Sequence, residues 1–357
     1  MRKFRVKKLL LAVAIGTMVI GATGCGTKTE SSNGTENAVA SEKTTQTNGE
    51  LKEFRVGCGD ATNNQLNDLA QVAQNNGYLE EELNKVGYTL KVTGFQGQGP
   101  EINAAIMSGS LDAGNYAEFP SYTSKASGAD TTIVAVTDPQ LLYGILAKDE
   151  NIKTVKDLEG KKIVVQQGTS LQYVWNRIVD ETGIDESKVE VINSNVVDGL
   201  SLVQTGDADA VLSSASSVQN FENQGQGHAV EGINADVAYT VTLFNVSNKI
   251  LQESPDVAVA INKALIRSYE EVKNDPEKLY SVLGSRYGEK GADVIKDTYT
   301  INGSLDYISP EINDDFLTYM NDTYAWMKDK SLLAKDIDLN TYIDRSYYEK
   351  AVEELGE

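Results

Sequence analysis

Two stretches of the chain repeat one phrase: AAIMSGSLDAGNY at residues 104–116 and LSLVQTGDADAVLSS at residues 200–214. In both stretches an apolar helical pattern ends at a glycine, and a short strand follows an Asp-Ala pair. Gly109 in the first copy corresponds to Gly206 in the second. The repetition predicts two copies of one helix–turn–strand unit, and therefore two similar lobes.

The segments around the two copies alternate in the same way. Strands are expected at 53–59, 88–95, 111–118, 131–138, 141–149, 162–166, 189–195, 208–214 and 238–246. Helical patterns occupy 64–83, with a stop at Gly77, and then 100–110, 169–181, 197–207, 256–283, 310–328 and 338–355. This alternation predicts an α/β fold with parallel, doubly wound sheets and a helical C-terminal extension.

A chain of 357 residues is long enough for two such lobes. We expect lobe one to comprise 51–139 plus 240–357, and lobe two to comprise 140–239. The chain then crosses between the lobes near 138–141 and 237–240. Ligands of open α/β sheets bind beyond the carboxyl ends of the strands. Two such ends that face each other predict one shared cleft.

The N-terminal residues differ in composition from the expected lobes. MRKFRVKK carries five basic side chains and precedes an apolar stretch that is short for a membrane span. This stretch ends in Ala-Thr-Gly-Cys, which resembles a bacterial lipobox. We therefore expect a lipoprotein signal peptide at 1–24, lipidation of Cys25, and a flexible linker over 25–50, where aromatic residues are absent.

Charge and rare residues exclude several classes of function. The formal net charge of −20 disfavours nucleic acid as a partner, because phosphates need a basic surface. If Cys25 carries lipid, Cys58 has no partner for a disulfide, and it is expected to be buried at the end of a strand. His228 is the only histidine. We therefore expect no metal site, no cofactor and no catalytic residues.

The loops that follow the expected strands contain the candidate ligand contacts. None of these loops contains Lys, Arg or His, so an anion there would need hydroxyls, backbone N–H groups and helix N-termini. Carboxylates in the same loops suit an amine or a ring N–H. The candidate contacts are Asp60, Thr62, Gln96, Tyr116, Glu118, Asp138, Gly168, Thr169, Ser170, Asp198 and Ser214.

Several residues near these loops have competing structural roles. Asp198 and the Thr169–Ser170 pair can act as helix caps. The repeated aspartates, Asp112 and Asp209, are expected to accept hydrogen bonds from turn amides. The rings of Tyr116, Tyr122, Tyr143 and Tyr173 can form walls of the cleft, whereas Leu171, Trp175 and Ile178 share one helical face and are expected in the core.

The frame resembles the solute-binding proteins of bacterial ABC importers, in the branch for aliphatic sulfonates, taurine, nitrate and thiamine-pyrimidine precursors. The matching segments are FRVGCG, FQGQGPEINAAIMSGSLDAGN, KTVKDLEGKKIVVQQGTSLQYVW and LVQTGDADAV, and the resemblance covers about 53–300. It implies a type II periplasmic-binding-protein fold that closes on its ligand by a hinge motion. It also implies a membrane permease as partner and a monomer held by lipid at the extracytoplasmic face of the cell membrane.

The ligand itself stays open between two chemistries. A taurine-like or other alkanesulfonate fits the helix N-termini and the carboxylates. A nitrogen heterocycle, such as a thiamine pyrimidine precursor, fits the tyrosines. The loop SSASS at 213–217 lacks the aromatic residue that sulfonate-binding members often carry there. A surface lipoprotein that senses a ligand without transport, and an enzyme of the same fold, are the other classes of function.

Overall fold

The structure of the protein is a computed structural model that describes residues 50–300 and 304–356. The expected signal peptide at 1–24, the lipidation site at Cys25 and the linker up to residue 49 lie outside these residues. Among the described helices, none has the length and apolar composition needed to cross a bilayer.

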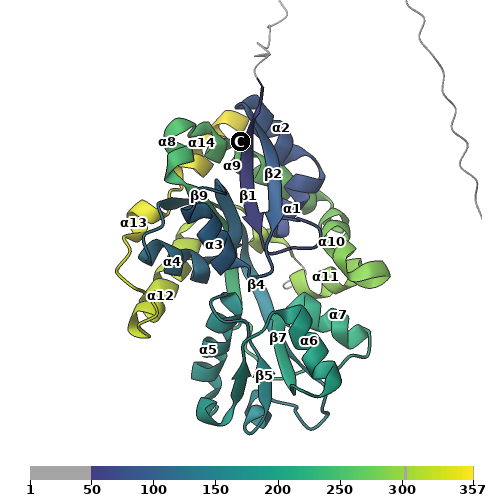
Figure 1. The fold of residues 1–357 in the computed structure, drawn as a ribbon. Coiled ribbons are helices and arrows are strands. Elements are labelled where there is room, and N and C mark those ends of the chain that lie inside the picture. Colours follow the sequence, from purple (N-terminus) through teal and green to yellow (C-terminus); the bar gives the residue numbers. More distant parts are fainter. Residues whose placement is uncertain (1–49, 301–303, 357) are drawn as a thin grey trace, which may run out of the picture. The chain divides into compact units, whose positions relative to one another are not determined.

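The strands form one mixed sheet with the order β2-β1-β3-β9-β4-β7-β5-β6, and β8 pairs with β4. The strands of the upper part in Figure 1 are β1 (Lys52–Cys58), β2 (Tyr88–Gly94), β3 (Ala113–Ala117), β9 (Tyr239–Ser247) and the first half of β4 (Thr131–Ala147). The lower part contains the second half of β4 with β5 (Lys162–Val164), β6 (Glu190–Ile192), β7 (Ala210–Ser214) and β8 (His228–Ala229).

Strand β4 connects the two lobes and corrects two expectations. Residues 131–138 and 141–149 were expected to be separate strands, but Thr131–Ala147 is a single strand. Its pairing with β9 ends at Leu142, and its pairing with β7 begins at Tyr143. The expectation of parallel sheets is confirmed for the pairs of β1 with β2 and β3 and of β5 with β6 and β7. It is wrong for the two crossing strands, because β9 runs antiparallel to β3 and β4, and β4 runs antiparallel to β7. The ladder is irregular around Pro139, which has no N–H to donate.

The repeated phrase corresponds to a repeated structure. In the first lobe β1 pairs in parallel with β3, and in the second lobe β5 pairs in parallel with β7. Gly109 (φ 75°) and Gly206 (φ 86°) both adopt the left-handed conformation that ends the preceding helix. The side chain of Asp112 accepts the backbone N–H of Arg55, and that of Asp209 accepts the backbone N–H of Lys162. Both aspartates therefore accept backbone N–H groups as predicted, but the donors belong to the neighbouring strands β1 and β5 and not to turns.

The helices cover both faces of the sheet (Figure 1). The first lobe carries α1 (Asp68–Asn75), α2 (Tyr78–Lys85), α3 (Gly99–Met107), α4 (Glu118–Ala126), α8 (Asn248–Glu253), α9 (Asp256–Asn274), α10 (Pro276–Gly284), α11 (Gly291–Tyr299), α13 (Leu339–Tyr342) and α14 (Ser346–Leu355). The second lobe carries α5 (Ser170–Thr182), α6 (Val196–Thr205) and α7 (Ala215–Asn223). Short 3₁₀ turns are η1 (Val155–Leu158), η2 (Glu186–Lys188), η3 (Ser285–Lys290) and η4 (Asp306–Ile308).

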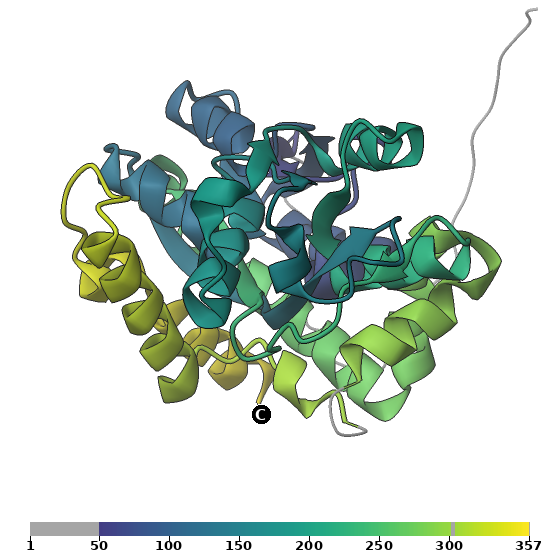
Figure 2. The ribbon, with the colours of Figure 1, turned by 90° about the horizontal axis from the view of Figure 1, so that it is seen from below.

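The C-terminal helix α12 (Asp314–Asp329) packs against both lobes. Its Thr323 hydroxyl is 3.2 Å from the hydroxyl of Tyr173 in α5, and Trp326 donates to Asp180 at 3.1 Å. Met320 accepts a hydrogen bond at its carbonyl from Tyr122 of α4. Figure 2 shows α12 and the α10–α11 pair on opposite sides of the second lobe.

The core expectations are mostly confirmed. Trp175, Ile178 and Leu171 are buried in the cluster that includes α12. Cys58 is fully buried at the end of β1 and is free. The C-terminal helical patterns are correct in kind, but two of them break: 256–283 divides before Pro276, which begins α10, and 338–355 divides into α13 and α14.

The two repeated aspartates differ in burial, so their replacement by asparagine is expected to lower the free energy of unfolding by different amounts. Asp112 also forms an ion pair with the Arg55 side chain at 2.6 Å, and its side chain is 10% exposed, against 31% for Asp209. We expect Asp112→Asn to lower the free energy of unfolding by about 2 kcal/mol. Asp209→Asn should cost less than about 1 kcal/mol. Urea midpoints at constant slope measure both values, and equal losses would contradict the ranking.

Candidate functional site: a cavity between the lobes

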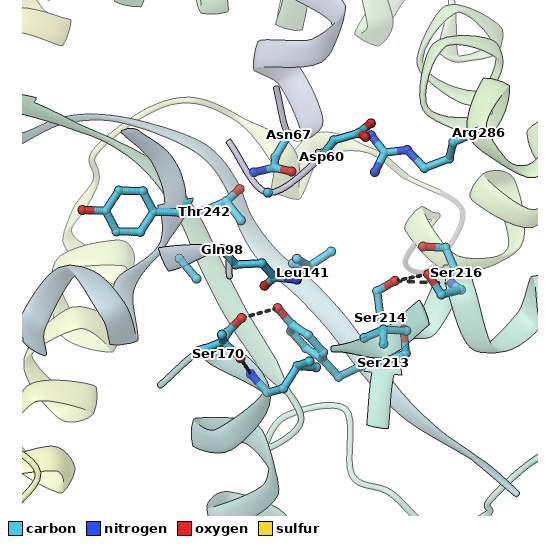
Figure 3. A pocket seen from close by; sticks show the side chains of 18 of the residues that line it. Asp60, Asn67, Gln98, Leu141, Ser170, Ser213, Ser214, Ser216, Thr242 and Arg286 are labelled. Atoms are coloured by element: carbon cyan, nitrogen blue, oxygen red, sulfur yellow. Dashed lines mark hydrogen bonds between the residues drawn. The ribbon is translucent and has the colours of Figure 1, made fainter. Parts of the chain in front are cut away.

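A cavity of about 540 Å³ lies between the two lobes. The first lobe lines it with residues from the β1–α1 loop, from the start of α3, and from β9, η3 and α11. The second lobe lines it with the starts of α5, α6 and α7 and with Leu141 and Tyr143 of β4. Figure 3 shows Asn67, Asp60 and Arg286 on one side and Ser170, Ser213 and Ser214 on the other.

The cavity is surrounded by helix N-termini. Residues at the starts of α1, α3, α5, α6 and α7 all line it. The first N–H groups of a helix have no partner within the helix, and the helix dipole makes that end positive. In α5 the side chain of Thr169 caps the N–H of Leu171, and in α7 the side chain of Ser214 caps that of Ser217. The N–H groups at these helix starts that no side chain caps favour a negatively charged ligand.

Arg286 adds a full positive charge to this surface. It lies in η3, between α10 and α11, and is the only basic side chain among the described residues that line the cavity. Arg286 is exposed, and its guanidinium donates a hydrogen bond to the side chain of Gln71 in α1. The remaining N–H groups of the guanidinium can bind the oxygens of an anion in a forked geometry.

The two lobes touch each other on two sides of the cavity. On one side the side chain of Gln166 donates to the carbonyl of Gln96 at 3.1 Å. On the other side the hydroxyl of Tyr287 lies 3.2 Å from that of Ser216 and 3.3 Å from that of Ser217. These contacts join segments of opposite lobes, so they can form only while the lobes are close together.

Two carboxyl groups also line the cavity. Asp60 caps its own turn, where its Oδ1 accepts the N–H groups of Thr62 and Asn63 at 3.0 Å. Asp68 is buried, and its carboxyl accepts hydrogen bonds from the hydroxyls of Thr242 and Tyr299. Burial raises the pKa of Asp68, although these hydrogen bonds and the charge of Arg286 oppose the shift.

A family model described as NMT1/THI5 like matches residues 70–279, which is more than half of the chain. The chain belongs to the NMT1/THI5-like family. The matched range includes the lobe-two helices that line the cavity and part of lobe one, up to α10.

Relatives of this NMT1/THI5-like chain include binding proteins. A protein of Bacillus subtilis (strain 168), named for aliphatic sulfonates binding, is 25% identical over 313 residues, which cover 85% of this chain and 90% of that protein. The alkanesulfonate-binding protein SsuA from Xanthomonas axonopodis pv. citri, solved bound to MOPS, has a TM-score of 0.66 at 19% identity and covers 83% of this chain and 99% of that one. The desulfurization enzyme DSZB has a TM-score of 0.61 at 14% identity, with 85% and 99% covered. These structures establish the periplasmic-binding-protein fold.

The structure brings together seven of the eleven candidate contacts of this NMT1/THI5-like chain. The residues that line the cavity are Asp60, Thr62, Gln96, Tyr116, Thr169, Ser170 and Ser214. Tyr143 also lines it, and its hydroxyl donates to Ser170 at 3.0 Å. The ring of Tyr116 lines the cavity, but its hydroxyl donates away from it to Asn103 at 2.6 Å. Contact of these residues with a ligand stays a prediction.

Four other candidates do not line the cavity, which corrects the expected site. Glu118 and Asp138 are fully buried in the first lobe and at the crossing. Gly168 lies against Pro100 of α3, so it faces the opposite lobe directly. Asp198 is exposed and takes part in the cap of α6 with Asn195. Tyr122 and Tyr173, which were proposed as walls, belong to the core.

Glu118 was expected to meet the ligand, and its burial has a clear cause. It is the first residue of α4, and its two oxygens accept the hydroxyl of Tyr319 at 2.7 Å and the N–H of Val241 at 3.2 Å. Both donors come from segments far along the chain, which the loop pattern could not indicate. Burial raises the pKa of Glu118 to about 7.

Arg286 and Asp68 line the cavity but were not predicted. Arg286 lies in a helical segment of the C-terminal region and Asp68 begins α1, so neither belongs to a loop that directly follows a strand. One signal for η3 was available: GSRYG at 284–288 interrupts a helical pattern with two glycines.

Neither a metal site nor a reactive cysteine emerges from the described residues. Within 50–300 and 304–356, no three His, Cys, Asp or Glu side chains are placed to hold a metal ion. Burial raises the pKa of the Cys58 thiol to about 11, so this thiol remains protonated at neutral pH.

Proposed function

We propose that the chain is the extracytoplasmic solute-binding component of an ABC importer, and that it captures a small sulfonate of the taurine or alkanesulfonate type between its lobes. The observation that carries this proposal is the convergence of helix N-termini and the Arg286 guanidinium on one cavity. A sulfonate has three oxygens with a shared negative charge, which several N–H and O–H donors can bind at once.

The relatives support the same ligand class. The Bacillus subtilis protein is named for aliphatic sulfonates, and the Xanthomonas protein was solved with MOPS, which is itself a sulfonate.

The proposed mechanism is closure of the lobes around β4 and β9. We propose the boundaries 51–139 plus 240–357 for lobe one and 140–239 for lobe two. A ligand that contacts Arg286 in lobe one and Ser170 in lobe two stabilises the closed state over the open state. The contacts of Tyr287 with α7 then form on closure, and a permease recognises the closed surface.

The proposed location follows from the N-terminal sequence. Cleavage before Cys25 and lipidation of its thiol anchor a monomer to the outer face of the cell membrane, and the linker up to residue 50 allows it to reach the permease. Mass spectrometry of the chain from membranes tests this, because lipidation adds a diacylglycerol to Cys25 and the Cys25→Ser variant cannot carry it.

A thermal-shift series on the full chain in detergent tests the ligand class. We expect ethanesulfonate or taurine to raise the melting temperature by several degrees, because a ligand at about 1,000 times its Kd adds about 4 kcal/mol. Nitrate and a pyrimidine serve as comparison ligands. Stabilisation by the pyrimidine alone would favour a vitamin precursor, and stabilisation by none of them would favour a sensing or partner-binding lipoprotein.

A further inference from the structure

Two buried carboxyl groups meet the crossing strands β4 and β9. Asp138 belongs to β4, and Asp68 begins α1 and lines the cavity. We propose that these two groups form a pair that holds one proton in the ligand-free protein, and that the pair takes up a second proton when an anion binds in the cavity. The second part of this inference rests on the proposed function.

Thr242 of β9 links the two carboxyl groups and lines the cavity (Figure 3). It is the register partner of Asp138 in the β4–β9 ladder, and its hydroxyl donates a hydrogen bond to Asp68. The hydroxyl of Thr137 lies 2.8 Å from that of Thr242. Because a hydroxyl has a single proton and Thr242 gives it to Asp68, Thr242 accepts from Thr137. Thr242 therefore has no proton left to donate to Asp138.

Asp138 lacks the partners that a buried carboxylate needs. Its side chain is fully buried, and its Oδ1 accepts the N–H of Gln140 at 2.7 Å. Its Oδ2 has no hydrogen-bond partner among the described residues. An ionised carboxylate without partners is costly in the interior of a protein. Burial and the charge of Asp68 both raise the pKa of Asp138 well above its usual value, so Asp138 holds the proton at neutral pH.

Asp68 is the better place for the negative charge of the pair. Its carboxyl accepts hydrogen bonds from Thr242 and from Tyr299 of α11. Burial raises its pKa, and these hydrogen bonds together with the positive charge of Arg286 in η3 limit the rise. The other titratable groups that face the pair are tyrosines of α11, η4 and β4, and burial raises the pKa of each, so all are neutral: Tyr299, Tyr307 and Tyr143.

An anion in the cavity changes this balance of charges. It pairs with Arg286 and thereby offsets the positive charge that favours ionised Asp68. The negative charge of the anion also repels the carboxylate that lines the same cavity. Both effects raise the pKa of Asp68 in the complex, so binding draws a proton onto the pair. A sulfonate is a strong acid that stays ionised, so an affinity that falls as pH rises has its origin in the protein.

Isothermal titration of the full chain in detergent with ethanesulfonate tests the uptake of the second proton. We expect the Kd of wild type to rise at least about tenfold from about pH 5.5 to about pH 8. In Asp68→Asn the Kd should stay within about threefold of the value that wild type has at the acidic end, because asparagine resembles the protonated carboxyl. This variant should therefore bind ethanesulfonate more tightly than wild type at the alkaline end, an outcome that loss of folding cannot produce.

The variants are chosen so that other causes can be told apart. Residue 68 has a φ of 56°, and asparagine tolerates this left-handed conformation well. Glu118→Gln is the matched control, because Glu118 is also a buried acid with a raised pKa but does not line the cavity. We expect the Kd of this control to change with pH as that of wild type does.

Urea unfolding of Asp138→Asn without ligand tests the first proton. The folded wild type keeps this proton while the unfolded chain releases it, so wild type loses stability as pH rises through the range between the two pKa values. We expect the unfolding equilibrium constant of wild type, relative to that of the variant, to rise about tenfold per pH unit from about pH 5 to about pH 7. A constant ratio means that Asp138 is ionised in the folded state, which overturns the pair.

The outcomes separate this inference from the proposed function. A wild-type Kd that does not change with pH, or the same pH dependence in Asp68→Asn, overturns the uptake of a proton and leaves sulfonate binding intact. Absence of ethanesulfonate binding at every pH overturns the proposed function and the uptake together, and the urea series then decides whether the pair holds its first proton.

Discussion

Replacement of Arg286 by glutamine is expected to weaken binding of an alkanesulfonate on the order of 100-fold. The guanidinium is the one basic group among the described residues that line the cavity, and we expect a bound anion to shield it from water. Truncating one partner of a desolvated, hydrogen-bonded charge pair costs about 3 kcal/mol. Arg286→Lys should show an intermediate loss, because the ammonium keeps the charge but not the planar fork. Isothermal titration measures all three affinities.

The control for this prediction is Lys290→Gln. Lys290 ends the same 3₁₀ turn, is exposed, and does not line the cavity, so its removal changes the charge of η3 without touching the site. We expect an effect below about threefold, which screening by salt reduces further. If both variants weakened binding equally, Arg286 would act through the general field of η3 and would not contact the ligand.

A second large effect is expected in the pH dependence of stability. Burial raises the pKa of Glu118 to about 7, well above the usual value of a glutamate, so near neutral pH the folded state holds a proton that the unfolded state has released. Stability is therefore lost as pH rises through this window, and it is fully present below it. The loss from this one group amounts to about 3 kcal/mol between pH 4.5 and pH 7.

The variant Glu118→Gln isolates this contribution. Glutamine cannot ionise, and its amide can accept the N–H of Val241 while it donates to the Tyr319 hydroxyl. Measured by urea unfolding, the difference in stability between Glu118→Gln and wild type should shift in favour of the variant by about 3 kcal/mol from pH 5 to pH 8. The stability of the control Glu253→Gln, at an exposed side chain at the end of α8, should change with pH in the same way as that of wild type. Parallel curves for Glu118→Gln would show that Glu118 is ionised throughout.

The sequence predicted the architecture because the features that set it are local. The paired glycines and Asp-Ala dipeptides mark turns whose conformation depends on a few neighbouring residues, and the structure places them in equivalent positions. The joining of 131–138 and 141–149 into one strand was not predicted. Pro139 normally interrupts a strand, and here the pairing with β9 continues on both sides of it through register shifts.

The site was predicted only in part, for a reason that is also physical. Loops after strands supply the serines and threonines of the cavity, and a search along the chain finds these. Whether a candidate side chain is buried or reaches the cavity depends instead on segments that are distant in the sequence and pack beside it. Tyr319 of α12 and Val241 of β9 cover Glu118, and η3 brings Arg286 to the opposite side of the cavity. Such contacts join residues more than a hundred positions apart, and no local pattern encodes them.

Helix α12 also limits how this architecture can diversify. Its side chains bury Tyr173 of α5, and Lys330 just beyond it pairs with Asp180 at 2.7 Å, so residues 140–239 are not an autonomous module. Recombination that exchanged that segment between relatives would separate α5 from the surface that evolved to cover it. New ligand preferences are therefore expected to arise by point substitutions in the cavity loops, where α3, α5, α6 and α7 begin, and not by exchange of whole lobes.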